Sequence, residues 1–443
     1  MKRQLHLNLF IQGRGSHEAA WRHPLSSTAE LTDISYYQNL ARRAEAGLFD
    51  SIFFADQLTT NTAQTKSAKA LQVWLEPITM LAAIAVATTR IGLIATGSST
   101  YTEPFNLARQ FASIDHISQG RAGWNIVTSW MAAAARNFGD TGQLSHSERY
   151  ALAEEHVQIV KGLWDSWADD TIIDDRQNAV FANTDRIRPI DFKGEYFNVA
   201  GPLNLPRGPQ GHPVLVQAGS SEDGRGFAAR HAEAVFTAHI EKTTAQAFYS
   251  DMKSRVAAKG RRPDQVLILP GLCPTIASTE AEAKRLLLEL SNYADVEIAV
   301  KYLGTWFGGH DFSHLPLDRP LTVADFPDLS NIETSKSRTE MVINLIKREE
   351  ITLRELLARF AHIGGHYLFA GTAEQVADLI EDWFLDGAAD GFNLMPPLLP
   401  TMLDIFIDEV VPLLQRRGLF RTEYQGTTLR EHYGLERPAS VFV

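Results

Sequence analysis

The chain has 443 residues, 44% of them hydrophobic and 21% charged, so it can bury a large core as an ordinary globular protein. A net charge of −11 argues against a nucleic-acid-binding surface, and the single cysteine, Cys273, cannot form an intrachain disulfide. No segment has the roughly 18 consecutive apolar residues of a membrane helix, and residues 1–11 alternate like a strand rather than forming the apolar block of a signal peptide. We therefore expect a cytoplasmic protein that neither enters a membrane nor binds nucleic acid.

The first half of the chain alternates between predicted strands and predicted helices. Strands are predicted at 4–12, 51–56, 91–99 and 124–128. Helices are predicted at 36–47, 77–88, 105–118 and 150–167. Because a helix follows each strand, this order predicts a parallel sheet joined by right-handed crossovers.

The second half continues this order with two interruptions. Segment 169–213 is rich in Asp, Asn, Pro and Gly, and segment 304–336 is rich in glycine and proline, so both are interpreted as insertions. Further strands are predicted at 214–218, 234–238, 266–276 and 391–396. Helices are predicted at 227–231, 243–259, 279–302, 338–347, 352–362, 372–385 and 401–416.

Eight strands in this order predict an α/β fold, namely a (β/α)8 TIM-type barrel with insertions after strands four and seven. An open doubly wound sheet is the alternative. The barrel would form a single domain over 1–416, with its insertions at about 169–213 and 304–336. We expect the polar tail at 417–443 to pack on the barrel or on a partner subunit.

Polar side chains occur where the predicted strands end. In the stretch GRAGWNIVTSW at 120–130, a β-branched and aromatic strand carries Asn125, Thr128 and Ser129 toward its carboxyl end. The ends of the earlier strands carry, in chain order, His17, Trp21, Arg22, Asp56, Ser99 and Tyr101. Because the strands of a barrel end at one rim, we expect these groups to converge there. Each pattern taken alone also fits an ordinary strand end that enters a polar loop.

A glycine–serine turn, Gly219-Ser220-Ser221, precedes a predicted helix. Such a turn presents free backbone N–H groups at the positive end of a helix dipole, which favours an anion, although a plainly capped helix start has the same pattern. The turn follows the fifth predicted strand, whereas the common phosphate site of barrels follows strands seven and eight. The residues alone therefore indicate a phosphorylated cofactor or substrate in a barrel mouth.

Other chemistries have little support in the sequence. The glycine-rich loop at 13–15 lacks the third glycine of a dinucleotide-binding fingerprint, and neither a Walker A motif nor a Gly-x-Ser-x-Gly elbow is present. His362 and His366 have the spacing of metal ligands on a helix, but two glycines lie between them and break such a helix. We predict no metal site.

Three blocks of sequence carry a family resemblance: ARQFASIDHISQGRAGWNIVTS at 108–129, VLVQAGSSEDGRGFAARHAEAVF at 214–236 and RRGLFRTEYQGTTLREHYGL at 416–435. The chain resembles, essentially from end to end, the nitrilotriacetate/dibenzothiophene-sulfone monooxygenase branch of the bacterial luciferase-like flavin family. The resemblance implies a two-component monooxygenase that takes reduced FMN from a separate NAD(P)H:flavin reductase and uses O2 to oxygenate a small organic substrate. It also implies a homodimer or higher homo-oligomer. A deazaflavin-dependent dehydrogenase and a non-catalytic flavin-binding paralogue are the alternatives.

The same resemblance implies roles for individual residues. The implied flavin contacts are Asp56 and Ser99 beside the ring, Asn125, Thr128 and Ser129 at its polar edge, and Tyr150, Gly219, Ser220 and Ser221 around the ribityl phosphate. His17 is the candidate catalytic residue, facing oxygen or substrate. Trp21, Arg22 and Tyr101 are candidate substrate contacts, and the identity of the substrate stays open.

Overall fold

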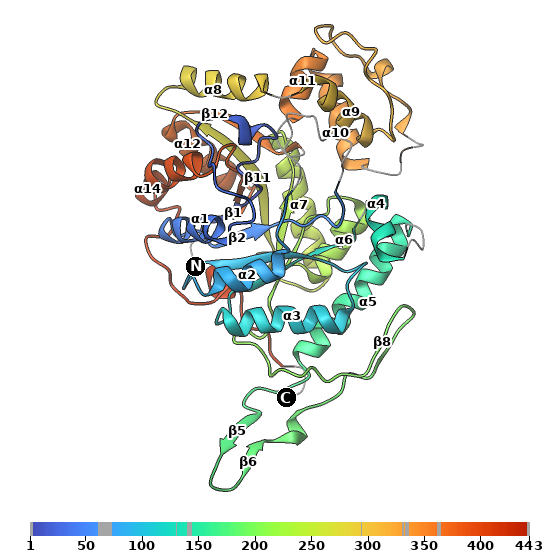
Figure 1. The fold of residues 1–443 in the computed structure, drawn as a ribbon, viewed down its shortest axis with the longest axis vertical. Coiled ribbons are helices and arrows are strands. Elements are labelled where there is room, and N and C mark those ends of the chain that lie inside the picture. The colour runs from blue at the N-terminus through green and yellow to red at the C-terminus, as the bar shows by residue number, and fades with distance from the viewer. Residues whose placement is uncertain are drawn as a thin grey trace.

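A closed barrel of eight parallel strands is the centre of the computed structural model, which describes residues 3–60, 73–129, 131–139, 144–293, 295–329, 332, 336–360 and 365–440 (Figure 1). Its strands are β1 (His6–Phe10), β2 (Ser51–Phe54), β3 (Gly92–Ser98), β4 (Ala122–Val127), β9 (Val214–Gln217), β10 (Ala234–Thr237), β11 (Leu267–Ile276) and β13 (Gly391–Leu394). They pair in chain order, and β13 pairs with β1 to close the ring. The predicted barrel is therefore confirmed, and each predicted strand overlaps an observed one.

The helices that follow the strands form the outer layer of the barrel (Figure 1). They are α1 (Ile34–Ala46), α2 (Pro77–Ala85), α3 (Pro104–Ile117), α5 (His146–Trp164), α6 (Glu222–His231), α7 (Lys242–Ala258), α8 (Glu280–Asn292), α12 (Ala373–Leu385), α13 (Thr401–Ile405) and α14 (Val411–Arg416). Capping and proline residues in the sequence determine where several of these helices begin. Proline occupies the first turn of α2 and α3, and Ser145 starts α5 with a capping box.

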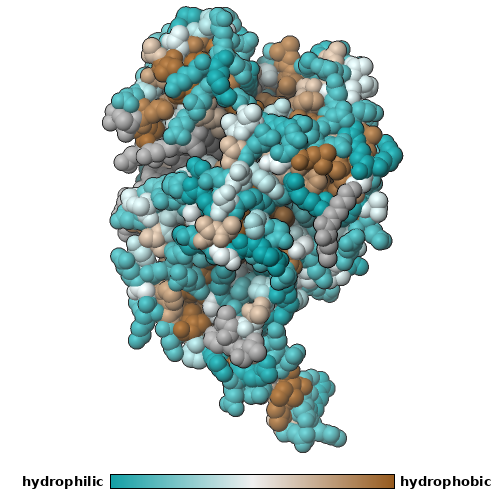
Figure 2. Space-filling view, turned by 180° about the vertical axis from the view of Figure 1, so that it is seen from behind, coloured by the Kyte–Doolittle hydropathy of each residue, from teal (hydrophilic) through white to brown (hydrophobic). Residues whose placement is uncertain are grey.

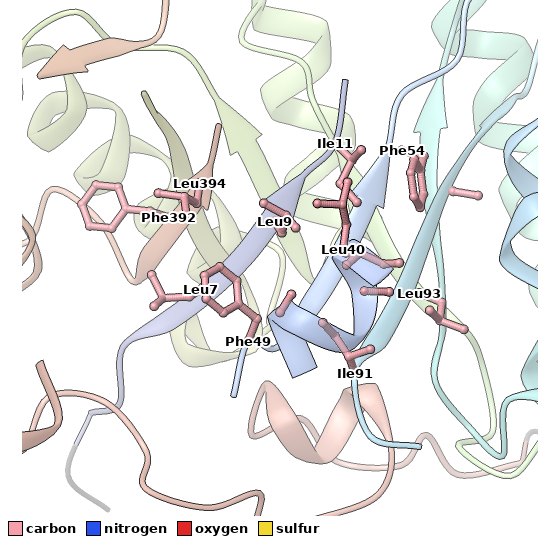
Figure 3. Packing of buried hydrophobic residues seen from close by; sticks show 14 of the residues in the cluster. Leu7, Leu9, Ile11, Leu40, Phe49, Phe54, Ile91, Leu93, Phe392 and Leu394 are labelled. Atoms are coloured by element: carbon pink, nitrogen blue, oxygen red, sulfur yellow. The ribbon is translucent and has the colours of Figure 1, made fainter. Parts of the chain in front are cut away.

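Strand residues alternate between two buried faces. In β1, Leu7 and Leu9 point outward and pack beside Phe392 and Leu394 of β13 under the helices (Figure 3). Phe10, the residue after Leu9, points inward, into a second cluster that fills the barrel. Because both faces of each strand are buried, the strand sequences are nearly continuous apolar runs. A polar residue on the inner face is therefore an exception to the pattern.

The C-terminal tail closes the end of the barrel at which the strands begin. Its helix α15 (Leu429–His432) places Leu429 against Gly92 and Gly123: a β-carbon on Gly92 would collide with it, and one on Gly123 would come within 3.2 Å of it. The Tyr433 hydroxyl donates to Asn8 Oδ1 inside the barrel at 2.9 Å, and Arg421 forms a buried ion pair with Asp50. The described part of the tail thus covers this end of the barrel, and the opposite rim, where the strands end, is the one at which TIM-type barrels bind their ligands.

Segment 169–213 leaves the barrel after β4 and carries two small hairpins, β5 (Ile172–Asp175) with β6 (Val180–Ala182) and β7 (Phe192–Lys193) with β8 (Asn198–Val199). The β5–β6 hairpin projects from the lower end of the molecule, where it forms an apolar patch (Figures 1 and 2). Its exposed large apolar residues are Ile172, Ile173, Val180 and Phe181.

A helical lobe follows α8 and has a core of its own (Figure 1). It contains α9 (Val296–Trp306), α10 (Lys336–Arg348) and α11 (Leu353–Phe360). The prediction of one helix over 279–302 is wrong, because α8 ends at Asn292 and Asp295 caps a new helix by accepting the Ile298 N–H at 3.2 Å. A further strand, β12 (Tyr367–Gly371), was not predicted and pairs with the far half of β11 outside the ring.

Within the described residues, no helix is both long and apolar enough to span a bilayer, and no group of three or more metal-binding side chains is present. His362, one of the two histidines considered above, lies outside the described residues.

Candidate active site

Asn125 is the polar residue that β4 turns into the barrel. Its neighbours Trp124 and Ile126 pack outward under the helices, so the alternation of the strand places the Asn125 amide inside. The amide nitrogen donates to Thr96 Oγ1 at 2.8 Å, and the Thr96 hydroxyl in turn donates to the Phe54 carbonyl at 3.0 Å. The Asn125 Oδ1 atom is buried without a hydrogen-bond partner among the described residues. A buried acceptor left open is unfavourable by about 1–3 kcal/mol, which a donor on a ligand would recover.

Gln217 gives a second open acceptor at the end of β9. Its side chain is 4% exposed, and its Oε1 atom also has no partner among the described residues. The turn at 219–221 begins two residues later, and a β-carbon on Gly219 would collide with Gln217 Nε2, so this amide packs against the turn. Sequence reasoning missed Gln217, although a polar residue ending the aliphatic run VLVQ is the same signal that singled out Asn125.

Tyr150 joins the turn to β4. Its hydroxyl hydrogen-bonds with the side chains of Ser221 and Thr128, while burial raises the pKa of the phenol and keeps it protonated. A β-carbon on Gly219 or on Gly224 would come within 2.8 Å of the Tyr150 hydroxyl oxygen. The two glycines therefore leave a narrow space that the hydroxyl enters.

Ser221 caps helix α6 at the same place. Its Oγ accepts the Gly224 N–H at 3.1 Å, and it lies 3.3 Å from His146 Nε2. The turn follows β9, the fifth strand of the barrel, as the sequence predicted. The structure thus brings Thr128, Tyr150 and the turn at 219–221 together around one helix N-terminus, next to the buried amides of Asn125 and Gln217.

Ser99 and Ser129 lie at the ends of β3 and β4. Ser99 is fully buried, and its hydroxyl donates to the Val127 carbonyl at 3.1 Å, so it ties the two strands together. Ser129 Oγ lies 2.7 Å from Ser98 Oγ, and its φ of 34° is in the left-handed region. The hydroxyl of each serine therefore already forms a hydrogen bond within the protein.

His17 lies in the loop after β1, on the other side of the mouth. Ser16 ties this loop to the end of β13, because its hydroxyl donates to the Met395 carbonyl at 2.8 Å. In the ring of strands, β1 stands four places from β9, so His17 and the glycine–serine turn belong to opposite sectors of the rim.

The protonation state of His17 follows from its surroundings. Burial and the neighbouring His23 lower the pKa of His17 to about 4, so the ring is neutral near pH 7. Its Nδ1 accepts the Ala19 N–H at 3.1 Å, which leaves the proton of the neutral ring on Nε2.

The other candidates are distributed around the rim. The Arg22 guanidinium donates to the Tyr293 carbonyl at 2.7 Å and lies over the Tyr293 ring, so it is held at the end of α8. Trp21 is 43% exposed. Tyr101 stacks on Phe138 with 4.6 Å between ring centroids. Asp56 is half-buried, and burial raises the pKa of its carboxyl, with a further contribution from Glu76.

Comparison with known proteins shows which family the chain belongs to. The family model described as luciferase-like monooxygenase matches residues 14–390. The chain belongs to the luciferase-like monooxygenase family. It is an enzyme of the monooxygenase class, and the resemblance found in the sequence is confirmed.

Individual relatives cover nearly the whole chain. N-acetyl-S-(2-succino)cysteine monooxygenase of Bacillus subtilis is 46% identical, over 99% of this chain and 98% of the relative. Nitrilotriacetate monooxygenase component A of Aminobacter aminovorans is 44% identical, over 98% and 97%. Among solved structures, riboflavin lyase with a modified FMN and riboflavin superposes with a TM-score of 0.86 at 31% identity, over 98% of this chain and 97% of that one.

Proposed function

We propose that this luciferase-like monooxygenase is the oxygenating component of a two-component system. It would take reduced FMN from a separate NAD(P)H:flavin reductase and use O2 to oxygenate a small organic substrate. One observation carries the proposal: the Tyr150 hydroxyl, Thr128 and the turn at 219–221 lie together at a helix N-terminus, beside two buried amides whose acceptors have no partner among the described residues. A relative named as a component A, and a neighbour whose structure holds a modified FMN, support the same function.

The residues present fit a flavin nucleotide. The N–H groups at the start of α6 and the protonated Tyr150 hydroxyl would donate to its phosphate. Asn125 Oδ1 would accept an N–H from the polar edge of the ring, which removes an unfavourable open acceptor. When bound, reduced FMN supplies the electrons that activate O2.

The remaining task of the chain is to keep water out and to place a polar group near the substrate. Phe10, Phe53 and Phe236 contact one another inside the barrel and give its interior an apolar lining. His17 adds an uncharged imidazole in the opposite sector of the rim. A neutral donor suits this place, since it can hydrogen-bond to a polar atom without introducing a buried charge.

We also propose that the chain is cytoplasmic, where reduced flavin is produced from NAD(P)H, and that it forms a homodimer or higher homo-oligomer. Light scattering on the purified protein tests the second point. A mass of one chain at micromolar concentration would contradict it.

The function is tested by mixing the protein anaerobically with photoreduced FMN and then with oxygenated buffer. We expect saturable binding of reduced FMN, and reoxidation with a time course different from that of free flavin. Candidate substrates are then ranked by product formed per reduced flavin consumed. Reoxidation at the rate found without protein, together with tight binding of a deazaflavin, would instead support the dehydrogenase alternative.

A further inference from the structure

The β5–β6 hairpin is the tip of a longer two-stranded ribbon, residues 166–188, which we call the arm (Figure 1). At its base the Arg188 N–H donates to the Ser166 carbonyl at 2.9 Å. At its tip the Asp175 carboxylate accepts the backbone N–H of Asn178 at 3.0 Å and its side-chain amide at 2.7 Å. Hydrogen bonds at both ends therefore give the arm a defined shape, although it projects away from the barrel.

The tip of the arm is apolar on both of its faces. Val180 and Phe181 are neighbours in β6, so their side chains point to opposite faces of the ribbon, and they are 39% and 69% exposed. Ile172 and Ile173 of β5 add two more exposed apolar side chains to the patch (Figure 2). An isolated two-stranded hairpin is only marginally stable in water, and a contiguous exposed apolar patch marks an interaction surface. We therefore expect another molecule to cover the tip.

The arm carries the features of a surface that can pair with its own copy. Among the described residues, β5 and β6 pair only with each other, so each has one unpaired strand edge. The tip also carries both signs of charge, because Asp174 and Arg176 are 57% and 89% exposed. Around a two-fold axis, Arg176 of one chain can approach Asp174 of the other while the apolar side chains pack between them.

We infer that the arm is the surface through which two copies of this chain associate, arm against arm. The inference rests on the proposed homo-oligomer and names its contact surface. The size of the arm suits this role, since each partner contributes roughly 20–30 residues to a standard interface. A second copy would cover the apolar tip permanently, whereas a reductase that visits only to deliver flavin would leave it in water for most of the time.

Replacing Ile173 and Phe181 together by threonine tests the inference. Threonine keeps the β-propensity of the strands but removes most of the apolar surface. Burying one large apolar side chain favours association by about ten- to a hundredfold. We therefore expect the double variant to dissociate at a protein concentration at least about tenfold higher than the unmodified chain does. The measurement is the mass from light scattering over a dilution series.

Leu288→Gln provides a matched control. Leu288 is 62% exposed on α8, far from the arm in the sequence, and glutamine is compatible with a helix. This variant also loses an exposed apolar side chain, and we expect its mass to match that of the unmodified chain at every dilution. Thermal melts establish that each variant is folded before masses are compared.

Chemical crosslinking tests the contact directly. The chain's own thiol, Cys273, is 1% exposed, and burial raises its pKa to about 12, so it does not compete with a thiol introduced on the surface. If two arms pack together, Ile173→Cys should give a covalent dimer with a short bismaleimide. Leu288→Cys should give none under the same conditions.

The outcomes separate the inference from the proposal on which it rests. If the unmodified chain had the mass of a monomer at micromolar concentration, the proposed homo-oligomer would fail and the inference with it. If the unmodified chain were oligomeric but the double threonine variant kept the same mass at every dilution, or Ile173→Cys gave no linked dimer, the inference would be overturned while the homo-oligomer stood. Coverage of the arm by a reductase would likewise leave the mass unchanged and overturn the inference.

Discussion

Gly219→Ala is the substitution whose outcome the structure determines most closely. A β-carbon at this position would lie 2.2 Å from Gln217 Nε2 and 2.8 Å from the Tyr150 hydroxyl oxygen. To restore a contact of 3.4 Å, these atoms would have to retreat by about 1.2 Å and 0.6 Å. The Tyr150 movement withdraws its hydroxyl from Ser221 and Thr128, the two side chains with which it hydrogen-bonds.

The magnitude follows from those two hydrogen bonds. Each contributes about 0.5–1.5 kcal/mol, so a displaced hydroxyl should weaken the phosphate site by about 1–3 kcal/mol. This corresponds to a rise of about 5- to 150-fold in the Kd for reduced FMN. Reduced riboflavin should bind the variant about as well as it binds the unmodified protein, since the change is confined to the phosphate end.

The assay is an anaerobic fluorescence titration with reduced FMN and, separately, with reduced riboflavin, and Gly226→Ala is its control. Gly226 lies in α6, and a β-carbon there would meet only Arg230 Nη1, at 3.9 Å. Because alanine is favoured over glycine in a helix by about 0.5–1 kcal/mol, this control should bind FMN normally and melt at the same or a slightly higher temperature. Equal FMN affinity in Gly219→Ala and Gly226→Ala, with both folded, would refute the assignment of the turn to the phosphate.

Three further outcomes are expected. Replacing Ser220 and Ser221 together by alanine should weaken reduced FMN binding by about 1–3 kcal/mol in the same titration, and unchanged affinity would contradict the phosphate role. His17→Ala should leave flavin affinity nearly intact but lower the product formed per reduced flavin, and full coupling would remove His17 from the mechanism. Burial raises the pKa of the Asp115 carboxyl to about 6 from a value near 3.8, so the folded state holds this proton more tightly than the unfolded state. The resulting stability is complete below about pH 4 and is lost as pH rises through 6, by up to about 3 kcal/mol. Asp115→Asn should flatten this dependence in urea melts at pH 5 and pH 8, and equal slopes in both proteins would contradict it.

Much of the fold follows from sequence because the barrel strands are short apolar runs ended by polar residues. Asn125 could be singled out since one amide in a buried strand breaks a strong pattern. The helix break at Asp295 was missed because a single capping residue within a helix-forming stretch is a weak signal beside the surrounding periodicity. Strand β12 was missed because it is half-buried and owes its pairing to the length of β11.

In the candidate site, too, some residues could be predicted from the sequence and others could not. The turn at 219–221 and Tyr150 are local motifs, and the structure places them in contact. The Arg22 guanidinium donates to the carbonyl of Tyr293, which is 271 positions away in the chain. No local sequence pattern could show that this hydrogen bond forms. Gln217 acquires its place under the turn only once β9 is fixed between β4 and β10.

Closure of the barrel by the C-terminal tail has a consequence for biosynthesis. Asn8 bonds to Asn393 across 385 positions and to Tyr433 across 425, so the first strand finds its final partners only when almost the whole chain exists. At about 5–20 residues per second, a ribosome needs roughly 20 to 85 s to span that interval. During this time the nascent chain carries an open sheet edge and the uncovered apolar face of β1, both of which invite association with other chains. Loss of the last fifteen residues would remove Leu429 and Tyr433, so we expect such a chain to close its ring through β13 but to leave the starting end of the barrel uncovered.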